Sequence, residues 1–194
     1  MSKSFLYSIL FISICFSPLS NSSGTMSEKQ IENVKKTEIE NEDQRQRISI
    51  TAGLLAAYEF AAKKLINNLE NESSTSKAIS KQAEVLLVLS EDIIASARFR
   101  LPQCDEYLTK TLALKDSLND MSHETLEKDY HHDAALPKAP SECYHTKDLF
   151  VHPATVIILT RDDPSLNNAT KSSINAEITE VLGHTELVRQ LVIY

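Results

Sequence analysis

The sequence predicts an all-α protein: a four- to five-helix bundle stapled by one disulfide and preceded by a cleaved signal peptide. Apolar residues recur at three- and four-residue spacing in several long segments, which is typical of amphipathic helices. Glycine occurs only 3 times in 194 residues, whereas all-β folds need many tight turns that depend on glycine. Short polar loops join the helical segments, and this arrangement favours a bundle.

The N-terminal segment has the three parts of a secretory signal peptide. Lys3 supplies a positive start, and residues 5–16 form an apolar core too short for an ordinary transmembrane helix. Small residues then follow, so we expect a signal peptide over residues 1–24 with cleavage at about residues 22–24. Cys15 is an alternative site for lipid attachment, although a bulky Ile14 precedes it. The mature protein is therefore expected to be periplasmic or secreted, soluble, and without a transmembrane segment.

Removal of this leader leaves two cysteines, Cys104 and Cys143. An even number of cysteines in an oxidising compartment predicts a disulfide between them. Closing the loop of about 40 residues would stabilise the fold by on the order of 4 kcal/mol in the chain-entropy model. Two separate buried thiols are the alternative.

The rest of the chain divides into a polar arm and one domain. Residues 25–42 carry scattered apolar positions among many charges and predict a flexible arm. Residues 43–194 predict the helical bundle. Helices are expected over residues 43–68, over 75–99, from 104 or 105 to about 121, over a shorter piece from 122 to 132, from about 141, and over 171–192.

The segment around Pro153 is the hardest to interpret. We expect Pro153 to interrupt the helix that begins near Ser141, with a new helix over 154–160. The β-branched run over 155–160 is also compatible with a buried strand. A helix is preferred because the segments that could pair with such a strand fit helices better.

Composition and missing motifs exclude several function classes. The net charge is −7, and no cluster of Lys and Arg is present, so nucleic acid is not expected as a partner. Scarce glycine excludes the dinucleotide fingerprint and the phosphate-binding P-loop. The sequence also lacks the G-x-S-x-G elbow of serine hydrolases and the C-x-x-C-H motif of covalent haem attachment.

Histidine is the residue type whose distribution suggests chemistry. All 6 histidines follow residue 122. On a helix, His145, Asp148 and His152 share one face, and so do His123, Glu127 and His131 if no break separates them. Imidazole and carboxylate groups suit zinc, copper or iron. The predicted metal ligands are His131, His132, His145, Asp148 and His152.

Other interpretations of these histidines stay open. Polar helix faces carry His and Asp as solvated residues, and no strict zinc spacing such as H-E-x-x-H is present. A di-iron bundle would need Glu-x-x-His on two long helices. Glu142 and His145 match that motif, but Asp129 and His132 match it poorly and stand too close in sequence.

Three functions follow from these observations. The first, reached mostly by elimination, is an exported, non-enzymatic binding or interaction module with an unidentified envelope or extracellular partner. The second is a periplasmic or secreted metal-binding protein that uses the His/Asp cluster around residues 131–152. The third is an envelope enzyme in which Asp148 and His152 act as an acid/base pair.

Overall fold

A computed structural model describes residues 27–194, and all of its regular elements in that range are helical. The predicted all-α class is therefore confirmed for the described residues, and the strand alternative for residues 155–160 is wrong. The predicted signal peptide and Cys15 lie outside the described residues. The elements are α1 (Glu28–Leu69), α2 (Ser76–Arg100), η1 (Pro102–Cys104), α3 (Asp105–Leu112), α4 (Leu114–Ser117), α5 (His123–Leu126), η2 (Glu127–His131), α6 (Glu142–Asp162) and α7 (Asn168–Val192).

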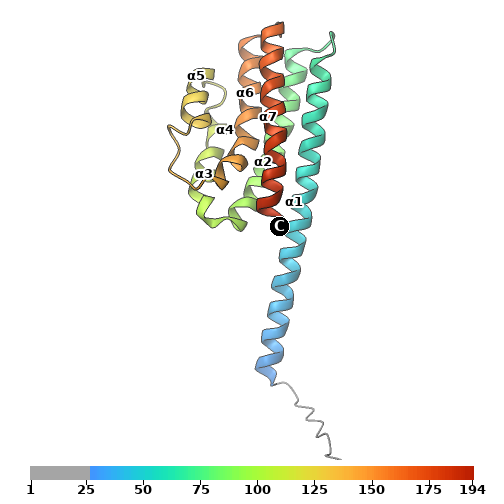
Figure 1. The fold of residues 1–194 in the computed structure, drawn as a ribbon, viewed down its shortest axis with the longest axis vertical. Helices are drawn as coiled ribbons and strands as arrows, with labels where there is room; N and C mark the ends of the chain where they lie inside the picture. The colour runs from blue at the N-terminus through green and yellow to red at the C-terminus, as the bar shows by residue number, and fades with distance from the viewer. Residues whose placement is uncertain (1–26) are drawn as a thin grey trace, which may run out of the picture. The chain divides into compact units, whose positions relative to one another are not determined.

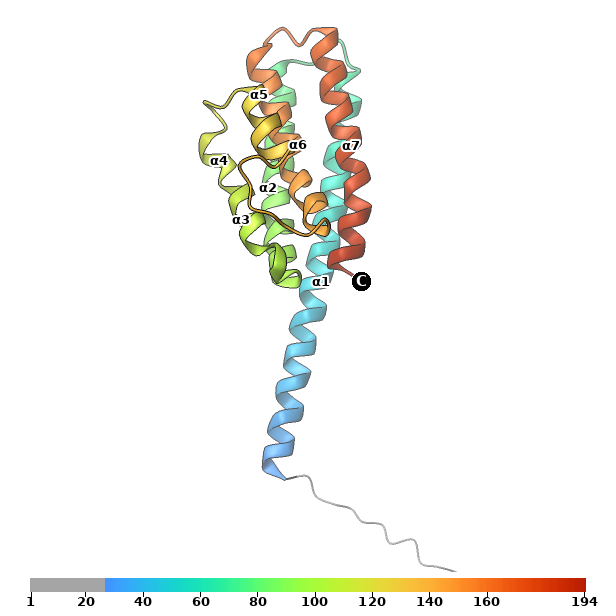
Figure 2. The ribbon, with the colours of Figure 1, turned by 60° about the vertical axis from the view of Figure 1, so that its left-hand side comes forward.

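Glu40–Tyr194 form one compact unit of the chain. Within it, the C-terminal part of α1 runs side by side with α2, α6 and α7 (Figures 1 and 2). The shorter elements α3 and α5 pack against α6. The result is a four-helix bundle in which the segment between α2 and α6 covers one outer side.

Helix α1 begins at Glu28 rather than near Asp43. Residues 28–42, which the sequence assigned to a flexible arm, are therefore helical in the structure. Their exposed side chains are rich in Glu and Lys, which are strong helix formers even without an apolar stripe. Propensity thus accounts for a helical segment that hydrophobic periodicity does not reveal.

The apolar stripes read from the sequence form the core of the bundle. In α1 the buried residues include Leu55, Tyr58, Ala62, Leu65 and Leu69, the positions predicted to share a face. In α7 the buried residues are Ile174, Ile178, Val181, Thr185, Val188 and Val192, again as predicted. Helix α6 differs because it is buried along most of its length. It lies between α2 and α7 as the central helix of the fold.

Helix α6 passes through Pro153 without interruption, so the predicted break there is wrong. Proline has no N–H, and the carbonyl of Leu149, four residues earlier, therefore loses its helical donor. The hydroxyl of Tyr58 on α1 donates to that carbonyl at 2.7 Å, and Tyr58 is fully buried. A side chain from a neighbouring helix thus satisfies the backbone group that the proline leaves without a partner.

The predicted cysteine pair is confirmed at bonding distance. The sulfurs of Cys104 and Cys143 lie 2.05 Å apart, and their Cα atoms are 5.5 Å apart. Both residues are buried. The bridge links η1, after α2, to the first turn of α6. Among residues 27–194, no helix combines the length and the apolar character that a membrane crossing requires.

Candidate metal centre

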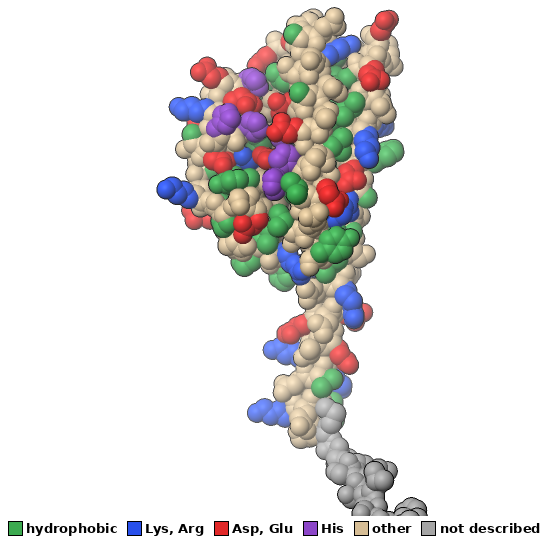
Figure 3. Space-filling model, viewed as in Figure 1, with side chains coloured by type: hydrophobic (Ala, Val, Ile, Leu, Met, Phe, Trp, Pro, Cys, Tyr) green, Lys and Arg blue, Asp and Glu red, His purple; other side chains and the backbone are tan. Residues whose placement is uncertain are grey.

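Helix α6 supplies the first row of the site. His145, Asp148 and His152 follow one another at spacings of three and four residues, and the structure places them on one face, as predicted. His152 is fully buried and Asp148 is almost so. Histidine side chains gather on the face of the molecule formed by α6, α7 and the segment before α6 (Figure 3).

Helix α7 supplies a second row that the sequence analysis missed. Glu177, Glu180 and His184 repeat the same spacing. The Nδ1 atom of His184 lies 2.9 Å from Nδ1 of His145 and 3.3 Å from Oδ2 of Asp148. The repeated spacing on the adjacent helix was the signal that could have revealed His184.

The third contribution comes from η2, a turn of π-helix that ends at His131. The hydroxyl of Ser122 accepts a hydrogen bond from the amide of Thr125 and so begins α5, which continues directly into η2. Glu127 lies between its two predicted neighbours, with Oε1 3.5 Å from His123 Nε2 and Oε2 3.0 Å from His131 Nδ1. His123, Glu127 and His131 therefore share one face, as predicted, although the chain changes from α-helix to π-helix between them. Single π turns are common at functional sites.

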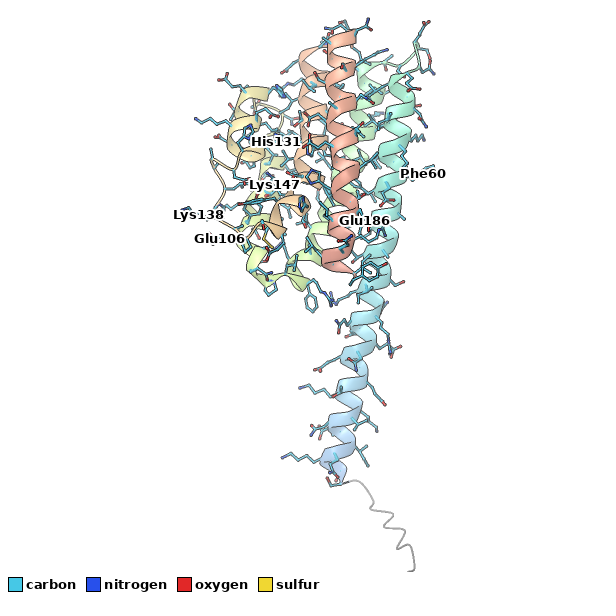
Figure 4. The ribbon with its side chains drawn as sticks, viewed as in Figure 1. Phe60, Glu106, His131, Lys138, Lys147 and Glu186 are labelled. Atoms are coloured by element: carbon cyan, nitrogen blue, oxygen red, sulfur yellow. A yellow bond between two sulfur atoms is a disulfide. The ribbon has the colours of Figure 1, made fainter. Side chains whose placement is uncertain are left out.

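Lys147 fastens η2 to α6. Its side chain is only 3% exposed. The ammonium donates to the carbonyls of Tyr130 and His131, at 2.9 and 3.0 Å, and to Asp133 Oδ1 at 3.0 Å. Figure 4 labels His131 and Lys147, which lie on the side of the bundle that carries the segment before α6. This anchor holds the His131 segment against α6.

Four imidazole rings form a continuous row across the three segments. The ring centroids of His131 and His152 are 5.1 Å apart, those of His152 and His184 are 5.6 Å apart, and those of His184 and His145 are 5.0 Å apart. His132, a predicted ligand, is exposed and lies at one end of this row, beside His131 and Glu127. The structure thus brings together His131, His145, Asp148 and His152 and leaves His132 at the edge.

Three buried polar atoms of the site have no hydrogen-bond partner among the described residues: Glu127 Oε1, Asp148 Oδ1 and His152 Nε2. The other ring nitrogen of His152 lies 2.7 Å from Glu177 Oε2. Asp148 Oδ1 lies 3.2 Å from Lys147 Nζ, an ion-pair distance, but it accepts no hydrogen bond. Because burial without a partner costs about 1–3 kcal/mol per group, these atoms need an explanation.

The electrostatic surroundings favour neutral imidazole at His184. Its pKa is lowered by burial first, and then by the neighbouring His152 and His145. Asp148 and Glu180 act in the opposite direction and raise it. Metal ions bind the neutral ring, so the lowered pKa keeps His184 ready to act as a ligand near neutral pH.

The same residues fall into sets whose ligand atoms lie within 4.8 Å of one another. Each set offers nitrogen and oxygen ligands in the number that a metal ion needs from a protein. The sets are Glu127 with His131 and His132; His131 with Asp148 and His152; His145 with Asp148 and His184; and His152 with Glu180 and His184.

Asp148 and His152, the acid/base pair considered from the sequence, make no direct hydrogen bond with each other, although their ligand atoms lie within 4.8 Å. The carboxylate bonded to His152 is that of Glu177, on α7, and not that of Asp148. Searches of protein-family models, curated proteins and solved structures found no match to this chain. The inferences that follow therefore depend on the geometry of the site alone.

Proposed function

We propose that this protein binds a transition-metal ion with the histidines and carboxylates of η2, α6 and α7. The observation that carries the proposal is the state of His152. Its Nδ1 is paired with a carboxylate, and its buried Nε2 has no hydrogen-bond partner. Metal-binding histidines characteristically donate their second ring N–H to a carboxylate, which fixes the tautomer and orients the ring.

The charge of the cluster also supports a bound cation. Four carboxylates, those of Glu127, Asp148, Glu177 and Glu180, lie within or beside the row of rings. Lys147 is the cation in contact with Asp148. A divalent ion would offset most of the excess of negative charge. Imidazole and carboxylate together suit zinc, copper or iron.

Distances around His184 fit a small coordination sphere. In a tetrahedral zinc site with bonds of about 2.0 Å, neighbouring ligand atoms lie about 3.3 Å apart. The Nδ1 atom of His184 is 2.9 Å from Nδ1 of His145 and 3.3 Å from Oδ2 of Asp148. These three atoms therefore need only small adjustments to bind one ion.

The test uses the processed protein without an affinity tag, stripped with a chelator and then titrated with Zn²⁺, Cu²⁺ or Fe²⁺. At a free ion concentration 100 times Kd, binding to the folded state stabilises it by about 2.7 kcal/mol, which thermal unfolding readily detects. His152→Gln should remove most of this stabilisation. His123→Gln is the matched control, because His123 lies outside every set that contains Asp148. Absence of bound metal and of any thermal shift would end the proposal.

The proposed setting is the cell envelope or the extracellular space, as the signal peptide suggests. A partner-binding module is the second proposal for this chain. It is favoured by exposed apolar side chains on α1 and α2, including Phe60, Val85 and Val88. Phe60 is 71% exposed and projects away from the bundle in Figure 4. Loss of a cross-linked envelope partner in a Phe60→Ser, Val88→Ser variant would support this module, and unchanged cross-linking would count against it.

A further inference from the structure

We infer that the site holds two metal ions and that the carboxylate of Asp148 bridges them; this inference rests on the proposed function. The first ion would be held by His131, His152 and Asp148. The second would be held by His145, His184 and Asp148. Both sets are among those whose ligand atoms lie close together, and Asp148 is the residue they share.

The length of the row argues against a single ion bound by all four rings. No set of mutually close ligand atoms among residues 27–194 contains both His131 and His145. These two histidines stand at opposite ends of the row, with His152 and His184 between them. A metal–nitrogen bond is about 2.0–2.1 Å long, so one ion cannot reach both ends.

Asp148 lies between the two proposed ligand sets, in the position that a bridging carboxylate needs. On α6 it is about one helical turn from His145 on one side and from His152 on the other. Its Oδ2 atom faces His184 at 3.3 Å, within the second set. Its Oδ1 atom is buried and accepts no hydrogen bond, so it has lone pairs available for another ion. A carboxylate can offer one oxygen to each of two ions.

The two sets would bind through different ring nitrogens. In the first set, Nδ1 of His131 is paired with Glu127 and Nδ1 of His152 with Glu177, which leaves both Nε2 atoms as ligands. In the second set, the Nδ1 atoms of His145 and His184 face each other at 2.9 Å. The carboxylates of Glu127 and Glu177 thus orient the first set from outside, as such groups do around protein-bound metals.

A single central ion is the competing arrangement. His152, Glu180 and His184 also form a close set, which would use neither Asp148 nor the two end histidines. The side chain of Glu180 is 59% exposed, and this arrangement leaves Asp148 Oδ1 buried without a hydrogen bond. The two-ion arrangement uses two of the three atoms that lack a hydrogen bond, His152 Nε2 and Asp148 Oδ1, and we therefore favour it.

Each ion in the two-ion arrangement has three protein ligands. Structural zinc sites fill four positions with protein groups, whereas catalytic sites keep one position open for water or substrate. Paired ions about 3.5–4 Å apart are typical of enzymes that hydrolyse phosphate or peptide bonds. With three protein ligands each, both ions would keep a coordination position open for water or substrate at the interface of η2, α6 and α7.

The experiment measures how many ions bind and whether they interact. The processed, chelator-stripped protein is titrated with Cu²⁺, bound copper is quantified after gel filtration, and electron paramagnetic resonance reports coupling between ions. We expect two equivalents with a coupled signal in the unaltered protein. His131→Gln and His145→Gln should each reduce binding to one equivalent with an uncoupled signal. Both side chains are partly exposed, so these variants should still fold, and circular dichroism of the metal-free forms checks this.

The outcomes separate this inference from the proposed function. No bound copper refutes both. One equivalent that survives in His131→Gln and in His145→Gln, but is lost in Glu180→Gln, refutes the two-ion inference and leaves metal binding intact. Two equivalents that neither His131→Gln nor His145→Gln reduces also refute it. His123→Gln is the matched control, since it alters a partly exposed histidine outside every set, and it should keep two equivalents and the coupling.

Discussion

Replacement of Tyr58 by Phe tests the account of how α6 passes through Pro153. The substitution removes only the hydroxyl that donates to the Leu149 carbonyl at 2.7 Å. The carbonyl would then be buried without a donor, which costs about 1–3 kcal/mol. For a domain of this size, each kcal/mol lowers the melting temperature by about 2–4 °C. Urea unfolding of the metal-free protein, followed by circular dichroism, measures the loss.

A double-mutant cycle assigns that cost to the carbonyl. In Pro153→Ala, the new amide can donate to Leu149 within the helix, as in any regular turn. Tyr58→Phe should then cost less than about 0.5 kcal/mol in this background. Tyr144→Phe is the control, because its hydroxyl makes a long 3.3 Å contact with Ala139 at an exposed position. An equal cost of Tyr58→Phe with and without Pro153 would refute the reasoning.

Three further predictions concern stability and pH. Replacing Cys104 and Cys143 by Ser together should destabilise the fold by about 4 kcal/mol, measured by denaturant unfolding without reductant. The pKa of His184 is lowered in the folded state. The metal-free protein should therefore be most stable above about pH 6.5 and lose stability as the pH falls below that value. His184→Gln should reduce this difference in stability, measured by unfolding curves at about pH 8.0 and 5.5. Lys147→Met leaves Asp133 and the largely buried Asp148 without their shared cation and should cost about 3 kcal/mol, part of which Asp133→Asn should restore in the double variant.

Much of the fold could be predicted because a helix that buries one face has apolar residues at a spacing of three or four in its sequence. The stripes of α1 and α7 were read correctly, since those helices bury one face and leave the other in water. Helix α6 was harder, because nearly all of its faces are buried and the period is lost. Its passage through Pro153 depends on Tyr58, which is far away in sequence. No local pattern contains that information.

The candidate site was predicted only in part, for a similar reason. The row on α6 could be predicted from its own spacing. His184 and its neighbour Glu180 follow the same spacing on α7, yet their meeting with α6 depends on how the two helices pack. His132 is also a predicted ligand, but it is exposed, whereas the adjacent His131 is partly buried.

The position of the disulfide gives the two proposed ions different dependence on redox conditions. The loop closed by Cys104 and Cys143 contains His131 but none of the second set, because His145, Asp148 and His184 all follow it in the chain. Opening this covalent ring would loosen one ligand of the first ion and leave those of the second in place. In the zinc-loaded protein, reduction of the disulfide would then release Zn²⁺, which is not itself reduced, in two separate stages, with the His131 ion departing first.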